Sequence, residues 1–149
     1  MTAVFGIDFD NTIVCYDGLF HRVALERNLI TPETASTKDG VRNYLRACGM
    51  EDIWTELQGY VYGARMEEAE PFPGVVDFFT TAVRKGIPVY IISHKTRYPF
   101  RGPNYDLHEA ALNWLFSRGF FDTKKIGISR DNVFFETTKE GKLHKIGDM

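Results

Sequence analysis

The sequence predicts an α/β fold built around a parallel sheet. Three short apolar runs, at 3–9, 87–93 and 133–136, have the length and composition of buried strands, and helical patterns follow each of them. Strands that alternate with helices are typical of parallel sheets. Ligands of such sheets bind beyond the carboxyl ends of the strands, so the polar residues at those ends are the first candidates for a site.

The helical predictions rest on apolar periodicity and on residues that end helices. The predicted helices span 18–29, 39–49, 51–66, 74–85 and 106–118, and the start of a last one lies at Lys139. Residues 31–40 mix Pro, Thr, Ser and Gly and indicate a loop or a capped helix start. Residues 94–105 contain two prolines and a glycine and indicate a loop. The chain between the first strand and Pro71 is therefore mainly helical.

The composition is that of an ordinary soluble domain. The chain has 149 residues, 44% of them hydrophobic and 26% charged, which is enough for one domain with a hydrophobic core. Its net charge of −2 gives no reason to expect a nucleic acid as partner. The N-terminus lacks the basic start of a signal peptide, and no window approaches the roughly 18 apolar residues of a membrane span. Cys15 and Cys48 form no metal-type motif, and a reducing cytoplasm is the expected location.

Two aspartates close the first predicted strand, in the segment DFDNT at 8–12. Residues two apart on a strand point to the same side, so Asp8 and Asp10 would converge roughly 6.5–7 Å apart. Close carboxylates repel unless a positive group joins them, and Mg²⁺ is a natural partner because it prefers oxygen ligands. One carboxylate could then attack phosphorus while the other moves protons. An aspartate-rich turn is the competing interpretation, and the pair alone favours it.

The whole segment DFDNT after an apolar strand resembles the first motif, DxDxT/V, of the haloacid dehalogenase (HAD) superfamily. The resemblance implies that Asp8 forms an aspartyl-phosphate and that Asp10 is the general acid and base. It also implies that Thr12 braces the loop, that Asp8 and the Asp10 carbonyl hold Mg²⁺, and that backbone groups of Phe9 and Asn11 lie against the phosphate. An acid at position 10 marks phosphatases and phosphotransferases of the superfamily, not dehalogenases.

Later residues match two further motifs of that superfamily. The strand VYIIS supplies Ser93, and its hydroxyl and the neighbouring His94 would hold a phosphoryl oxygen. The segment TTKEGKLHK offers three lysines after the third strand, of which we favour Lys142, with Lys139 next, because the functional lysine lies near the helix start. Arg97 and Arg101 follow Ser93 closely and are candidates for a second anionic group of the substrate, although loop arginines are usually only solvated.

The resemblance also implies a domain organisation. Residues 1–13 and 71–149 would form a discontinuous HAD-like, Rossmann-like core, and residues 14–70 a small helical cap inserted after the first strand. The chain ends at Met149, within the helix that precedes the fourth, acidic motif, so we expect a C-terminally truncated core without that motif. The first strand would then be an open sheet edge, and we expect a homo-oligomer that pairs through this edge or swaps its C-terminal segment.

The functional hypothesis from sequence is a Mg²⁺-dependent phosphomonoesterase that acts on a small phosphorylated molecule through an aspartyl-phosphate. The alternative is a catalytically impaired or non-catalytic HAD-like module that binds or regulates, because the fourth motif is absent. A response-regulator receiver is disfavoured because roughly 80 residues separate the first two strands, whereas βα units repeat at about 30 residues. A phosphatase assay with and without Mg²⁺ separates the first two hypotheses.

Overall fold

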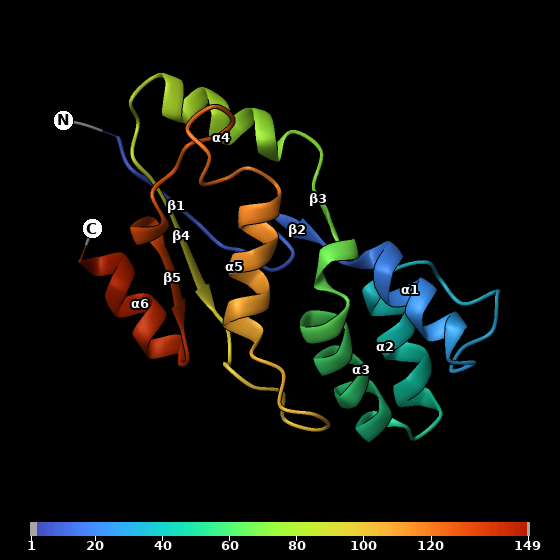
Figure 1. Ribbon diagram of the computed structural model, residues 1–149. Helices are drawn as coiled ribbons and strands as arrows, with labels where there is room; N and C mark the ends of the chain where they lie inside the picture. The colour runs from blue at the N-terminus through green and yellow to red at the C-terminus, as the bar shows by residue number, and fades with distance from the viewer. Residues whose placement is uncertain (1–2, 149) are drawn as a thin grey trace.

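The computed structural model describes residues 3–148 and confirms the predicted α/β fold class. Met1, Thr2 and Met149, which belong to the predicted core, lie outside these residues. Three parallel strands form the main sheet in the order β1-β4-β5. These strands are β1 (Phe5–Ile7), β4 (Val89–His94) and β5 (Val133–Glu136). Their carboxyl ends share one edge of the sheet because all three run the same way (Figure 1).

The helices lie close to the ranges expected from the sequence. They are α1 (Asp17–Glu26), α2 (Lys38–Ala47), α3 (Glu51–Ala64), α4 (Val75–Arg84), α5 (Leu107–Ser117) and α6 (Lys139–Gly147), with short 3₁₀ turns η1 (Met66–Glu68) and η2 (Arg130–Asn132). Three starts are capped by side chains: Thr37, Asp106 and Thr138 each accept a hydrogen bond from a backbone N–H of the first turn. The cap at Thr138 fixes where α6 begins, and this start sets which lysine faces the sheet edge.

Strand β5 shows how helices cover both faces of the sheet. Successive side chains of a strand point to opposite faces. Phe135 contacts Phe9 and His108 of α5, with ring centroids 5.6 and 5.4 Å apart. The next residue back, Phe134, stacks near Tyr90 and lies under Lys145 of α6. Helix α5 therefore covers one face and α6 the other.

The first strand is shorter than predicted, and two strands were missed. Strand β1 ends at Ile7, not at residue 9, because the chain turns immediately afterwards. A two-stranded antiparallel sheet then pairs β2 (Val14–Cys15) with β3 (Glu70–Pro71). Each strand has only two residues, too short to give an alternating apolar pattern. We call the helices α1–α3 the helical segment. Strand β2 comes before this segment and β3 after it, so the small sheet brings its two ends together (Figure 1).

The helical segment packs closely against the loop that follows β4. Gly59 and Gly63 lie on the face of α3 that meets this loop, and a Cβ at either position would collide with Pro99 or Tyr105 respectively. Close approach of this kind requires glycine. Asp52 at the start of α3 also pairs with Arg101 of the loop at 3.6 Å. The residues after Ser93 are thus held between the sheet and the helical segment.

Strand β1 is an open edge within residues 3–148, because β4 is its only partner there. Val4 and Phe5 are 45% and 38% exposed, and the Phe5 ring meets Phe78 of α4 at 5.3 Å between centroids. The expected apolar edge is therefore present. Self-association through it stays a prediction.

Candidate functional site

A tight turn after β1 carries both aspartates of the DFDNT segment. The Phe9 carbonyl accepts hydrogen bonds from the N–H groups of Ile13 and Val14, at 2.9 and 3.2 Å. Asn11 adopts a left-handed conformation with φ of 61°, which asparagine tolerates better than most residues. Asp8 and Asp10 are consequently not two positions of an extended strand, as the sequence suggested. The turn gives each carboxylate its own set of partners.

Asp8 faces Lys142. The Lys142 Nζ lies 3.5 Å from Asp8 Oδ1, and the Phe9 N–H donates to the same oxygen at 2.8 Å. The Asp8 side chain is 41% exposed and so remains accessible to a ligand. Lys142 is in the first turn of α6, where its N–H donates to the carbonyl of the capping residue Thr138 at 3.1 Å. The end of β1 and the start of α6 thus bring a carboxylate and an ammonium group together.

Asp10 is held by two other residues. The buried Lys95 approaches both oxygens of Asp10, with its Nζ 3.2 Å from Oδ1 and 3.0 Å from Oδ2. The Tyr16 hydroxyl also donates a hydrogen bond to Oδ1. The Lys95 side chain is only 4% exposed, against 22% for Asp10. This is a largely buried ion pair, in contrast to the more open pair of Asp8 and Lys142.

The position of Lys95 is determined by contacts along its whole length. Its N–H donates to the Glu136 carbonyl at 2.9 Å, which continues the pairing of β4 with β5. Its carbonyl lies 2.6 Å from His108 Nε2, and since a carbonyl can only accept, this ring nitrogen carries the proton. The Nζ lies 4.6 Å from the centroid of the Tyr62 ring and 5.8 Å from that of Phe9. Aromatic rings therefore cover the ammonium group that pairs with Asp10.

Burial changes the ionisation of the residues that the helical segment adds. It raises the pKa of Tyr16 well above its usual value, and the Asp10 charge raises it further, so this hydroxyl stays a donor. Burial and the Asp10 charge also raise the pKa of Tyr62. The first residue of α2, Lys38, donates to the Tyr62 hydroxyl at 2.6 Å. Its pKa is lowered, mainly by burial, although the Asp10 charge acts in the opposite direction.

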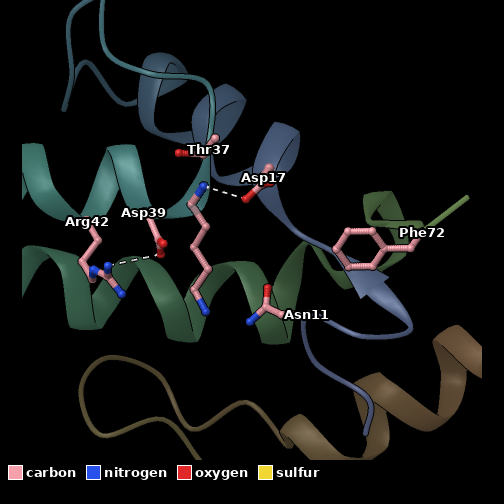
Figure 2. A pocket seen from close by; sticks show the side chains of 7 residues that line it. Asn11, Asp17, Thr37, Asp39, Arg42 and Phe72 are labelled. Atoms are coloured by element: carbon pink, nitrogen blue, oxygen red, sulfur yellow. Dashed lines mark hydrogen bonds and ion pairs between the residues drawn. The ribbon is translucent and has the colours of Figure 1, made fainter. Parts of the chain in front are cut away.

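A polar pocket of about 470 Å³ lies between the turn after β1 and the helical segment (Figure 2). Its lining residues are Asn11, Asp17, Thr37, Lys38, Asp39, Arg42 and Phe72. Two ordered contacts shape its wall: the Lys38 N–H donates to Asp17 at 2.9 Å, and Arg42 pairs with Asp39 at 3.3 Å. Phe72 is the one apolar side chain in this lining. The pocket therefore suits a hydrophilic ligand.

The other residues named from the sequence lie at varied distances from this pair of carboxylates. Ser93 is 1% exposed and pairs with Phe135, and it comes two residues after Ile91, the partner of Ile7, so it shares the sheet edge with Asp8. Thr12 lines a separate apolar hollow between β1 and α4. Three others are exposed: His94, Arg97 and Lys139. Arg97 pairs with Asp106 at 3.2 Å and Arg101 with Asp52 at 3.6 Å, so the described ion pairs of both arginines are with carboxylates other than Asp8.

Sequence reasoning missed Lys95, Tyr16, Lys38 and Tyr62. A signal for Lys95 was present, because two neighbouring carboxylates require positive charge and Lys95 follows directly after a strand end. That charge was assigned to Mg²⁺, and Lys95 was passed over because it lies within the loop predicted at 94–105. No comparable signal marks Tyr16 or Tyr62, because their approach to Asp10 depends on how the helical segment folds back.

The described residues contain neither a cluster of metal ligands nor a membrane-spanning helix. Among residues 3–148, no three His, Cys, Asp or Glu side chains come together as a metal site. Within the same part of the chain, no helix has the length and apolar character needed to span a membrane.

Comparisons with known proteins leave the family open. No family model matches the sequence, and no curated protein matches it. One solved structure that is similar is the crystal structure of a HAD family hydrolase from Deinococcus radiodurans R1 with bound phosphate and sodium. The two share 19% identity with a TM-score of 0.49, over 91% of this chain and 58% of that one. Similarity at this level assigns neither a family nor a function.

Proposed function

We propose that the protein is a phosphomonoesterase in which Asp8 attacks phosphorus. The pairing of Asp8 with Lys142 at 3.5 Å, beside the buried Ser93 at the same sheet edge, is the observation that carries the proposal. A carboxylate nucleophile and a fixed ammonium group are what phosphoryl transfer needs, since the protein must both attack phosphorus and neutralise its oxygens. The resemblance of DFDNT to the HAD phosphatase motif supports the same reading.

The partners of Asp8 distinguish its two oxygens. The Phe9 N–H and the Lys142 ammonium group both contact Oδ1 of Asp8. In this proposal Oδ2 attacks phosphorus, because these two contacts leave it free. As the bond from Oδ2 to phosphorus forms, the bond from phosphorus to the leaving oxygen breaks. Asp10, which is protonated at this point of the cycle, gives that oxygen its proton and becomes the carboxylate that pairs with Lys95. Asp10 then takes a proton from water as the water oxygen attacks phosphorus, and the bond to Asp8 breaks to release phosphate.

Magnesium fits this site only in a shared form. Asp8 would hold it through its carboxylate and Asp10 through its backbone carbonyl, because the Asp10 carboxylate is already paired with Lys95. Such a small donor set matches Mg²⁺, which keeps several waters and often binds through one or two protein oxygens together with a substrate phosphate. The ion would supply positive charge to the phosphoryl oxygens.

The rest of the substrate occupies the polar pocket beside Asn11 in this proposal. Because its lining is charged or polar except for Phe72, the substrate is a small hydrophilic phosphomonoester. The pocket offers both cationic and acidic groups, so it can meet hydroxyl, amine or carboxylate substituents.

Steady-state hydrolysis of phosphomonoesters, with Mg²⁺ and with a chelator, tests the proposal. We expect turnover by the wild type that Mg²⁺ increases, and none by Asp8→Asn, because an amide cannot attack phosphorus. Asp131→Asn makes the same chemical change at an exposed position in η2 and should leave turnover unchanged. Turnover by Asp8→Asn contradicts the proposal. Calorimetric binding of inorganic phosphate without turnover favours the non-catalytic module instead.

A further inference from the structure

Lys95 is a buried charge that the proposed mechanism leaves without a role. Its side chain is 4% exposed, so it has almost no surface with which to touch a substrate. Burying a lysine costs more free energy than burying an apolar side chain of similar size, and a buried ion pair seldom repays that cost. A role in stability therefore does not explain why a lysine stands here. Its only acidic partner among the described residues is Asp10.

We propose that Lys95 is a positioning residue that fixes the Asp10 carboxyl group for proton transfer to the leaving group. The proposal rests on the phosphomonoesterase function proposed above and deepens it. Lys95 contacts both oxygens of Asp10, and the Tyr16 hydroxyl contacts Oδ1 as well. Three contacts on one carboxyl group determine both its rotamer and the plane in which its oxygens lie.

The core and the helical segment both contribute to this arrangement. The core holds the Lys95 backbone through Glu136 and His108. From the helical segment, the Tyr62 ring of α3 covers the Lys95 ammonium group, with its centroid 4.6 Å from Nζ. Tyr16 is the residue just before α1. Docking of the helical segment thus shields the Lys95 ammonium group from water. A general acid needs an orientation of this precision, because proton transfer falls off quickly with misalignment.

The dependence of rate on the leaving group provides a test that a merely structural role would not pass. An alkoxide needs a proton as it leaves, whereas 4-nitrophenolate leaves without one. For Lys95→Met we expect kcat to fall about 10- to 100-fold on glycerol phosphate and by less than about threefold on 4-nitrophenyl phosphate. The first loss is smaller than the roughly 10²–10⁴-fold contribution of a general acid, because Asp10 itself is retained. Lys145→Met is the matched control, because Lys145 lies over the Phe134 ring at 4.3 Å and has no part in the mechanism. It should leave both rates unchanged.

A double-variant cycle asks whether Lys95 acts only through Asp10. In an Asp10→Asn background, Lys95→Met should add less than about a twofold change on either ester, because the two residues form one unit. If circular dichroism shows that Lys95→Met is unfolded, Lys95→Gln decides by the same two-ester comparison. Its shorter, uncharged side chain cannot hold both oxygens of Asp10, so the loss should again be greater on glycerol phosphate.

The outcomes separate this inference from the function on which it rests. A greater loss on glycerol phosphate than on 4-nitrophenyl phosphate supports it. Equal losses on both esters, no loss, or full additivity with Asp10→Asn overturns it and leaves the phosphomonoesterase intact. Absence of hydrolysis of either ester by the wild type overturns the proposed function and the inference together.

Discussion

Two groups of charges in this molecule differ in burial, and the difference separates a site from a surface. Around Asp10, the Lys95 side chain is 4% exposed and aromatic rings cover its ammonium group. Around Arg65, whose side chain is 20% exposed, a cluster with exposed acidic partners joins the end of α3 to the end of α1 and to η1. Its ion pairs are Arg65–Glu26 at 2.8 Å, Arg65–Glu68, and Arg22–Glu68 at 2.9 Å.

The two groups have different energetic consequences. Exposed ion pairs gain little because water screens them and their long side chains lose entropy. Buried pairs cost desolvation and are often replaceable by apolar residues without loss of stability. We therefore expect substitutions near Asp8 and Asp10 to act mainly on chemistry. Substitutions near Arg65 should act weakly, and only on stability.

The largest expected effect is on catalysis, at Lys142. Lys142→Met should lower kcat/KM for a phosphomonoester about a hundredfold or more, the order of loss seen when one group that stabilises developing charge is removed. The free energy of unfolding should barely change, because Lys142 is partly exposed at the start of α6. Turnover kinetics and urea unfolding measure the two quantities. Full activity of Lys142→Met would show that the contact with Asp8 has no catalytic role.

A smaller effect is expected on stability, at the buried pair. Lys95→Met alone should lower the free energy of unfolding by about 2–3 kcal/mol, less than for a fully buried pair because water reaches part of Asp10. Asp10→Leu combined with Lys95→Met should restore stability to within about 1 kcal/mol of the wild type. Urea unfolding of both variants measures this. If the double variant is less stable than Lys95→Met, the Lys95–Asp10 pair stabilises the fold. The proposed difference between this pair and the Arg65 cluster would then be wrong.

The smallest effect belongs to the exposed cluster and depends on pH. The Arg65 guanidinium lowers the pKa of Glu68 from 4.5 to about 2. A carboxyl group whose pKa is lower in the folded state stabilises the fold above the unfolded pKa, and this contribution is lost as pH falls from about 4.5 to about 2. Since Glu68 is 39% exposed, the contribution should stay below about 1 kcal/mol and shrink in high salt.

Arg65→Gln is the variant that isolates this contribution. Between pH 6 and pH 3, the unfolding temperature should fall slightly less steeply for Arg65→Gln than for the wild type at low salt. At high salt the two proteins should show the same fall. A difference of several kcal/mol, or one that persists in high salt, would mean that the cluster is not a screened surface group.

The same contrast explains what the sequence could foretell. Asp8 follows β1 and Lys142 comes after β5, the two outer strands of the parallel sheet. The rule that the carboxyl ends of parallel strands share one sheet edge needs only the order of elements along the chain. The six helices and the three main strands could likewise be predicted from apolar periodicity and from residues that end helices. The chemical roles of these residues stay predictions until they are measured.

What escaped prediction depends on tertiary packing. The sequence near Lys95 gives no sign that Tyr62, 33 positions earlier, will cover its ammonium group. Nor does it indicate that His108 will donate a hydrogen bond to the Lys95 carbonyl. The end of β1 at Ile7 was missed because the apolar run continues through Phe9, whose ring enters the core beside Trp114 while its backbone turns. The strands β2 and β3 were missed because two residues carry no period.

The most direct test of the account is the location of a covalent intermediate. Protein mixed with a phosphomonoester is quenched and treated with borohydride, which reduces an acyl phosphate and marks the residue that carried it. Peptide mapping by mass spectrometry then identifies that residue. We expect the mark on Asp8 in the wild type, and none in Asp8→Asn. Steady turnover with no mark, or a mark on Asp10 or another carboxylate, would contradict the assignment of Asp8 as the nucleophile.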